Sequence, residues 1–161
     1  MIEIIPLSAI APDRVEALLD AAFGADRKAR TAYKLRAGAA AIPSLSFAAV
    51  LKETLVGSLQ SWPVRVEGQS VTLVGPVAVS PEHQRSGIGR LLMERLITAA
   101  ADAPMMMIGD PEYYGRFFGF TAEATASWVL PGPVERHRLL AKQVPLGLVG
   151  TVSPDFRALA A

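Results

Sequence analysis

The stretch that decides the fold is residues 77–92, VAVSPEHQRSGIGRLL. It leaves a β-like run, passes through a tight loop with two glycines, Gly87 and Gly89, and enters an apolar-periodic segment. A helix that begins here leaves several backbone N–H groups unpaired and carries partial positive charge at its N-terminus. The glycines let an anion approach these amides closely. We therefore predict a diphosphate-binding loop, with Arg85 and Arg90 adding charge at its rim.

Two other kinds of phosphate loop fail on specific residues. A Walker A loop needs Lys and then Ser or Thr after its last glycine, whereas Gly89 is followed by Arg90 and Leu91. A dinucleotide fingerprint needs Gly or Ala at position 92, which is Leu92. It also needs an acidic residue about 20 residues on, after a second strand. Asp110 lies near that distance, but the βαβ pattern does not continue.

Around this loop, the periodicity and turn signals predict one α+β domain over residues 1–161. The expected helices cover residues 12–23, 26–36, 87–101 and 112–118. The expected strands cover residues 1–7, 46–50, 55–62 with an extension over 64–66, 70–79, 105–108, 126–130 and 138–143. The pair Gly75-Pro76 inside a strand suggests a bulge. The tail after Pro145 is predicted to wrap the surface.

Composition narrows the function classes. Hydrophobic residues make up 51% and charged residues 19%, which favours a packed globule. The net charge of +1 argues against nucleic acid or an anionic membrane as partner. The chain has no cysteine and only two histidines, so thiolate chemistry is excluded and we expect no metal. The first residues lack the basic start of a signal peptide, and no apolar run approaches about 20 residues, so we expect a soluble cytoplasmic protein.

The same stretch resembles a known motif. Gln84, Gly87 and Gly89 match the acetyl-CoA-binding pattern of the GNAT (GCN5-related N-acetyltransferase) superfamily, which is Gln or Arg, two variable residues, Gly, one variable residue, then Gly or Ala. Residues 109–120, GDPEYYGRFFGF, resemble the GNAT segment in which a tyrosine on a short helix precedes a Gly-Phe pair. Its Gly-Asp-Pro and Tyr-Tyr-Gly-Arg residues resemble the corresponding sequence of a bacterial GNAT subgroup whose substrates are largely unassigned. The resemblance covers residues 71–120 well.

The resemblance implies a fold and an activity. The fold would be a mixed, mostly antiparallel central sheet flanked by helices, with strands splayed around Gly75-Pro76. The activity would be N-acetyltransferase, moving an acetyl group from acetyl-CoA to an amine of a small molecule or protein. An N–H near Val77 would polarise the thioester carbonyl. The implied cofactor-binding residues are Val77, Ala78 and Val79, pairing with pantetheine, and Gln84, Arg85, Ser86, Gly87, Ile88, Gly89 and Arg90, cradling the pyrophosphate.

The catalytic residues stay partly open. A tyrosine usually protonates the leaving CoA thiolate in this family, and it stands four residues before the glycine of the Gly-Phe pair. Gly115 occupies that position here, so Tyr113 and Tyr114 both remain candidates, and we favour Tyr114. The general base is left unassigned: Glu53, Asp110 and Glu112 are available carboxylates, and a water relay is common in the family. Asp110 is better explained as a helix cap. His83 and His137 are expected to be ordinary loop and surface residues.

Two alternatives in other classes remain. A non-catalytic acyl-CoA-binding or regulatory domain would keep the same fold, and an unrelated nucleotide-binding domain would prefer ATP or NAD to CoA. The acceptor amine cannot be read from the sequence. The oligomeric state is equally open, although a homodimer is frequent in the family.

Overall fold

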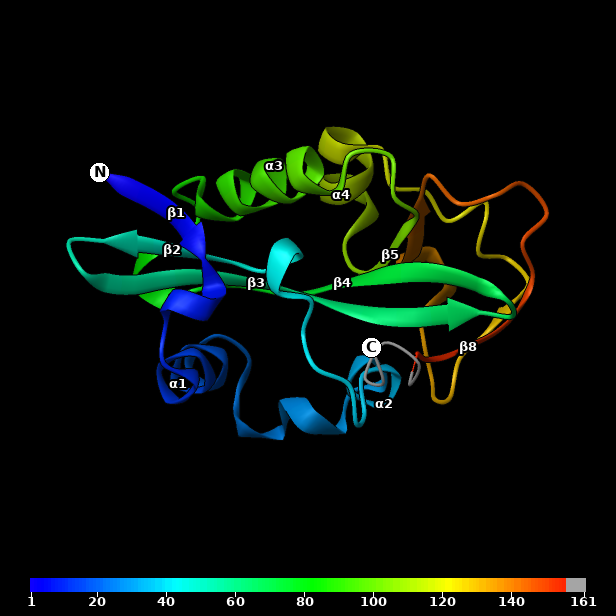
Figure 1. Ribbon diagram of the computed structural model, residues 1–161, viewed down its shortest axis with the longest axis horizontal. Coiled ribbons are helices and arrows are strands. Elements are labelled where there is room, and N and C mark those ends of the chain that lie inside the picture. The colour runs from blue at the N-terminus through cyan, green and yellow to red at the C-terminus, as the bar shows by residue number, and fades with distance from the viewer. Residues whose placement is uncertain (156–161) are drawn as a thin grey trace. The chain divides into compact units, whose positions relative to one another are not determined.

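As far as residue 143, helices and strands follow one another along the chain in the predicted order (Figure 1). The computed structural model describes residues 1–155. In chain order its elements are β1 (Ile2–Pro6), α1 (Pro12–Phe23), α2 (Thr31–Leu35), β2 (Phe47–Leu51), β3 (Thr54–Val66), β4 (Gln69–Val79), α3 (Ile88–Ala100), β5 (Met105–Ile108), α4 (Pro111–Phe118), β6 (Trp128–Val129), β7 (Leu139–Lys142) and β8 (Gly150–Pro154).

The strands of the described residues form an eight-stranded sheet in the order β1-β2-β3-β4-β5-β7, with β8 pairing both β3 and β6. The pairs β1–β2, β2–β3, β3–β8 and β5–β7 are antiparallel, whereas β4–β5 and β6–β8 are parallel. The predicted mixed, mostly antiparallel sheet is therefore confirmed. The β4–β5 ladder joins Thr72 to Met105 and Leu73 to Met106 and ends there. It stops just before Gly75, which has a φ of +130° and a cis bond to Pro76.

Three predicted elements differ from the structure. The helix expected over residues 26–36 is divided into a 3-10 turn, η2 (Ala25–Ala29), and the short α2, because the backbone at Arg30 is extended. The strand expected over residues 126–130 shortens to β6. The tail expected to wrap the surface contains β8, in which Val152 is buried and pairs with Val66. The end of that tail, residues 156–161, lies outside the described residues.

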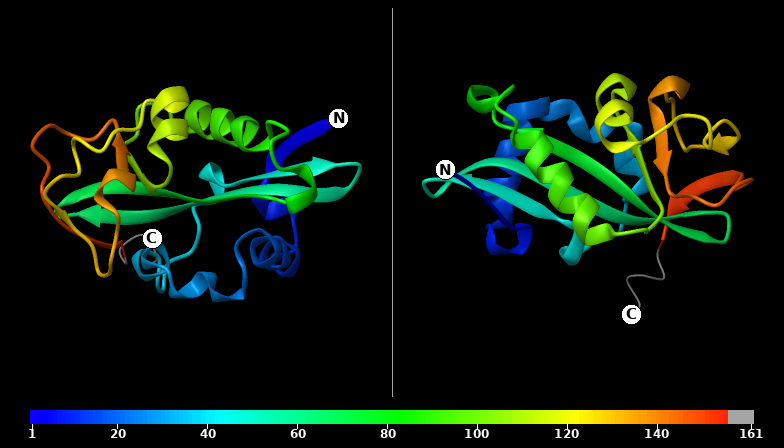
Figure 2. Two further views of the ribbon diagram at one scale, coloured as in Figure 1. Left: turned by 180° about the vertical axis from the view of Figure 1, so that it is seen from behind. Right: turned by 90° about the horizontal axis from the view of Figure 1, so that it is seen from above.

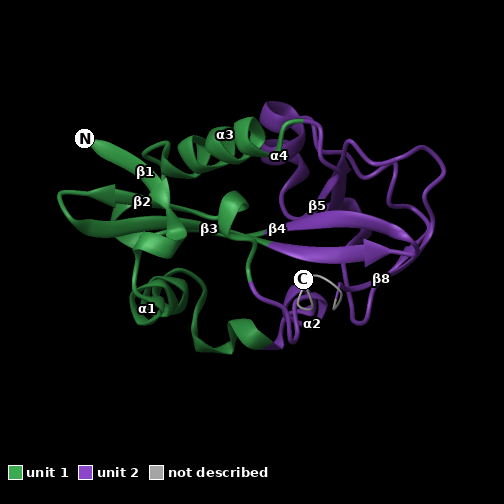
Figure 3. Cartoon of the chain, in the orientation of Figure 1, with its two compact units in different colours: residues 1–28, 41–61, 75–101 green, residues 29–40, 62–74, 102–161 purple. Residues whose placement is uncertain are grey.

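The described chain divides into two compact units, one of residues 1–28, 41–61 and 75–101 and the other of the remainder (Figure 3). We call them unit 1 and unit 2. Strands β3 and β4 run through both units. That the chain is a single functional domain therefore stays a prediction.

In unit 1, α1 and α3 cover opposite faces of the strands (Figures 1 and 2). Ala48 of β2 packs in one cluster with Leu18 and Leu19 of α1. The neighbouring Phe47 points to the other face, since successive strand residues alternate, and its ring lies 5.2 Å from the guanidinium of Arg95 on α3. Within unit 1, α3 and the loop before it therefore lie on the face of the strands opposite to α1.

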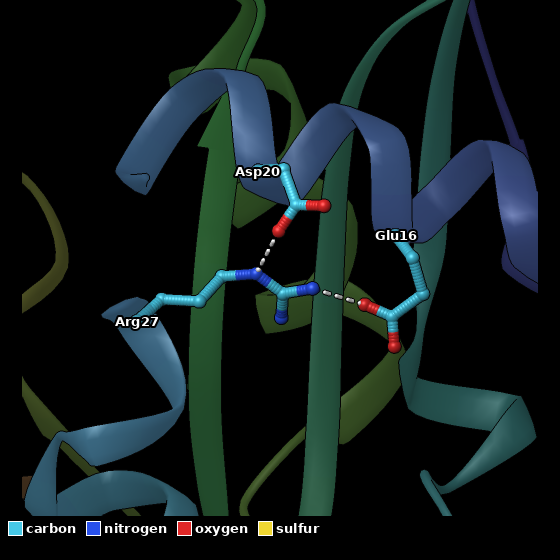
Figure 4. A network of polar contacts seen from close by, with 3 residues as sticks. All are labelled: Glu16, Asp20 and Arg27. Carbon is cyan, nitrogen blue, oxygen red and sulfur yellow. Dashed lines mark hydrogen bonds and ion pairs between the residues drawn. The ribbon is translucent and has the colours of Figure 1, made fainter. Parts of the chain in front are cut away.

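A buried arginine ties η2 to α1 within unit 1 (Figure 4). Arg27 is only 2% exposed. Its Nε donates to Asp20 at 3.0 Å and its Nη2 to Glu16 at 2.6 Å. Both carboxylates come from successive turns of α1 and remain half exposed. The network therefore fixes the chain where it leaves the helix.

In unit 2, the core gathers around β5 and β7. Met105, Met106, Leu139 and Leu140 have no exposed surface, and each strand pairs with the other over its full length. The ring of Trp128 is equally buried, and its Nε1 donates to the carbonyl of Leu148 at 2.9 Å. No helix of residues 1–155 is long and apolar enough to cross a membrane.

Candidate active site

The predicted diphosphate loop lies between β4 and α3 in unit 1. A 3-10 turn, η4 (Pro81–His83), follows the strand, and residues 84–87 are exposed. Arg85 has a φ of +64° and Gly87 a φ of +86°, so the backbone turns twice through the left-handed region. A Cβ built on Gly87 would meet no heavy atom within 4 Å. The glycine is thus required by its backbone angle, and the space before it is open.

The N-terminus of α3 is free to bind an anion. Gly87 is the N-cap, no side chain caps the helix, and its first turn holds no acidic residue. The helical hydrogen bond from the Leu91 N–H to the Gly87 carbonyl is 3.1 Å long, and the N–H groups of Ile88 and Gly89 precede it in the first turn. By contrast, α4 is capped by its own carboxylate, because Asp110 accepts a hydrogen bond from the Glu112 N–H at 3.0 Å. The N-terminal N–H groups of α3 can therefore bind an anion, whereas the N-terminus of α4 already has a carboxylate bound to it.

The side chains of the loop have unequal roles. Ile88 is buried, and a Cβ at Gly57 would come within 2.7 Å of its Cγ2, so its side chain is core and only its amide faces the loop. Arg85 is exposed. Arg90 is also exposed and its Nε donates to Glu94 at 2.9 Å. Exposed pairs of this kind contribute only about 0.3–0.5 kcal/mol, so exchanging the Glu94 contact for one with a phosphate would cost little.

The end of β4 leads straight into this loop. Ala78 has no exposed surface and packs in the α1 cluster, while Val77 and Val79 are half-buried. The Val79 carbonyl accepts from the Gln84 side-chain amide at 3.3 Å. Gln84 therefore folds back onto the strand, which explains physically why a glutamine suits the first position of the motif.

In unit 2, the two candidate tyrosines lie on α4. Both are half-buried, and their rings meet edge to face at a centroid distance of 4.9 Å. Tyr113 also contacts Phe117 and Phe118, with centroids 5.4 Å and 5.8 Å away. The Tyr114 ring lies against Gly109, where an added Cβ would stand 2.8 Å from both Cδ2 and Cε2.

The surroundings of Tyr114 keep it protonated. Burial raises the pKa of the Tyr114 phenol to about 12, and the nearby Tyr113 and Asp110 add to the rise while Arg138 opposes it. Its hydroxyl makes no hydrogen bond with another residue in the range 1–155. A phenol with this pKa carries its proton throughout the physiological range.

The carboxylates that the sequence left open as general bases have different settings. Asp110 is the N-cap of α4, as expected. Glu112 is exposed in the first turn of the same helix, and Glu53 is exposed in the turn between β2 and β3, where its carbonyl accepts from Arg14. Within residues 1–155 no group of His, Cys, Asp and Glu is arranged to hold a metal ion.

A family profile settles the class to which the chain belongs. The profile described as "Acetyltransferase (GNAT) family" matches residues 13–120, well over half of the chain. The chain belongs to the GNAT acetyltransferase family. No curated protein matches its sequence significantly.

Solved GNAT structures share the fold. The GNAT family N-acetyltransferase YhbS from Escherichia coli, solved in complex with CoA, is 24% identical with a TM-score of 0.73, over 99% of this chain and 91% of that one. A GNAT acetyltransferase from Brucella melitensis, solved in complex with acetyl-CoA, is 24% identical with a TM-score of 0.65, over 96% of each chain. Naa50 from Arabidopsis thaliana, in complex with a bisubstrate analogue, is 12% identical with a TM-score of 0.54, over 89% of this chain and 99% of that one.

Two residues of this GNAT chain gain a role that the sequence did not reveal. His83, expected to be an ordinary loop residue, forms a hydrogen bond with Ser80 inside the predicted diphosphate loop. Gly109 leaves room for the Tyr114 ring. The sequence signal for His83 was a serine three residues before it and another three residues after it. The signal for Gly109 was its place between a buried strand and the start of a helix.

Proposed function

We propose that this GNAT protein is an N-acetyltransferase that moves the acetyl group of acetyl-CoA to an amine of a small molecule or a protein. The observation that carries the proposal is the start of α3. An uncapped helix N-terminus without acidic residues follows a loop whose Gln84, Gly87 and Gly89 match the family's cofactor motif. Related GNAT structures were solved with CoA or acetyl-CoA bound.

Each part of the site has a separate role in binding acetyl-CoA or in the reaction. The amides of the loop and the N-terminus of α3 hold the diphosphate, assisted by Arg85 and Arg90. The backbone of Val77, Ala78 and Val79 pairs with pantetheine. The neutral amine attacks the thioester carbonyl carbon, the C–S bond breaks as the amide forms, and the leaving sulfur takes a proton from the Tyr114 hydroxyl. The new amide loses its extra proton to solvent or a carboxylate, and the Tyr114 phenolate regains one.

Tyr114 is preferred to Tyr113 as the proton donor. Its hydroxyl is protonated at neutral pH and forms no hydrogen bond within residues 1–155, so its proton is not committed to another residue. Tyr113 instead packs against two phenylalanines, Phe117 and Phe118. The segment 109–116 also supports the finer proposal that the chain belongs to a bacterial GNAT subgroup of largely unassigned substrate.

The experiment is thiol release from acetyl-CoA in the presence of a panel of primary amines that includes polyamines, aromatic amines and N-terminal peptides. We expect at least one amine to stimulate release and Tyr114→Phe to lower kcat by about 10²- to 10⁴-fold with little change in acetyl-CoA affinity. Tyr113→Phe is the matched control and should change kcat little. Tight acetyl-CoA binding without release for any amine would favour the alternative, a non-catalytic acyl-CoA-binding domain.

A further inference from the structure

His83 lies at the centre of the hydrogen bonds inside the loop before α3. Its Nδ1 and the Ser80 Oγ are 2.7 Å apart. Its N–H donates to the Ser80 carbonyl at 2.9 Å. Its own carbonyl accepts from the hydroxyl of Ser86. One histidine therefore bonds to a serine three residues before it and to a serine three residues after it.

This loop needs such internal bonds. Arg85 is a non-glycine residue with a φ of +64°, a left-handed conformation that is strained for a residue with a side chain. Residues 84–87 are exposed, so packing cannot hold them in place. The side chains of Gln84, Ser86 and His83 supply the contacts that packing does not.

These hydrogen bonds connect the sheet to the start of α3. Ser80 is fixed to the sheet, because its N–H donates to the Val56 carbonyl of β3 at 2.9 Å. Ser86 precedes Gly87, the N-cap of α3. His83 thus connects the end of the loop that is anchored on the sheet to the end that carries the amides facing solvent.

We propose that His83 is a positioning residue, which fixes the amides of residues 86–89 in the arrangement that holds the diphosphate of acetyl-CoA. The inference rests on the proposed function. The His83 side chain makes no ion pair within residues 1–155, so it acts through the bond to Ser80. Its loss should therefore weaken cofactor binding and leave the chemical step alone.

The test uses the full chain and acetyl-CoA as the probe. His83→Ala should raise the dissociation constant measured by calorimetry about two- to tenfold, the effect of losing one hydrogen bond. The KM for acetyl-CoA should rise in parallel while kcat stays within about twofold of the wild-type value. His83→Asn should restore affinity, because an asparagine amide can stand where Nδ1 stands and bond Ser80. Ser80→Ala removes the same bond from its other side and replaces His83→Ala if that variant does not fold.

The matched control is His137→Ala. His137 is the other histidine of the chain, an exposed residue of unit 2 beside Glu135, and its loss should leave acetyl-CoA affinity unchanged. Unchanged affinity in both His83→Ala and Ser80→Ala would overturn the role of His83 while leaving the proposed function intact. A loss of affinity that His83→Asn does not restore would overturn it as well. Failure of the wild-type chain to bind acetyl-CoA would instead overturn the proposed function.

Discussion

Gly109→Ala tests how the Tyr114 ring is held. The new Cβ would stand 2.8 Å from Cδ2 and Cε2 of Tyr114 and 3.3 Å from Cε of Met107. Carbon atoms in ordinary contact are about 3.5–4.0 Å apart, so the ring must retreat by about 1 Å. The backbone at Gly109 cannot easily yield, because its N–H donates to the Arg138 carbonyl at 2.9 Å. Gly109 is also not among the glycines with positive φ, so the alanine acts through its bulk alone.

The expected loss of stability is that of an overpacked site. We expect the free energy of unfolding to fall by about 1–3 kcal/mol and Tm by about 3–10 °C. A proton donor displaced by about 1 Å should lower kcat by about ten- to a hundredfold. Chemical denaturation and the thiol-release assay measure the two effects. Gly68→Ala is the matched control, since Gly68 lies in an exposed turn with no heavy atom within 4 Å of its added Cβ.

A double-mutant cycle identifies the cause. In a Tyr114→Ala background the ring is gone, so Gly109→Ala should cost less than about 0.5 kcal/mol, which gives a large coupling energy between the two sites. If Gly109→Ala were as stable and as active as the wild type, or if its penalty persisted without the ring, the reasoning from this contact would be refuted.

The remaining predictions concern ionisable side chains and the backbone strain at Arg85. In an ultraviolet titration one tyrosine should ionise near pH 12, and this late transition should be absent from Tyr114→Phe. The folded pKa of Tyr114 lies above the unfolded value of about 10, so its contribution to the free energy of unfolding is complete below pH 10 and is lost between pH 10 and 12. A Tyr114→Phe variant with an unchanged late transition would contradict this. Combined Glu16→Gln and Asp20→Asn should cost about 1–3 kcal/mol in chemical denaturation, and more than Arg27→Met, because only the first change leaves a buried guanidinium without its carboxylates; the reverse order would refute the account of this network. Arg85→Ala should weaken CoA binding by about 1–3 kcal/mol in calorimetry. Arg85→Gly should weaken it equally but give a more stable protein, since glycine adopts a φ of +64° without strain; equal stability of the two variants would count against strain at this position.

The sequence was most informative where local rules determine structure. The two glycines, the strand before them and the amphipathic stripe after them are all local signals, and β4, the loop and α3 lie where these signals predict. Asp110 caps α4 as its position before Pro111 indicates.

The sequence was least informative where distant segments decide. Strand β8 is a short run among prolines and glycines, and it is held by pairing with Val64–Val66 rather than by its own pattern. The helix expected over residues 26–36 breaks at Arg30, whose extended backbone no single residue type requires. The roles of His83 and Gly109 depend on contacts that become visible only when the loop and the ring have positions in space.

The most direct test of the acetyl-CoA site is a calorimetric titration of CoA into Gly89→Glu. Gly89 stands in the first turn of α3 and is not among the residues with positive φ, so the glutamate adds bulk and negative charge without backbone strain. Gly68→Glu makes the same change in the exposed turn. We predict that Gly89→Glu folds normally and has no detectable CoA affinity, while Gly68→Glu binds CoA like the wild type. A folded Gly89→Glu protein with unchanged CoA affinity would show that the start of α3 is not the site.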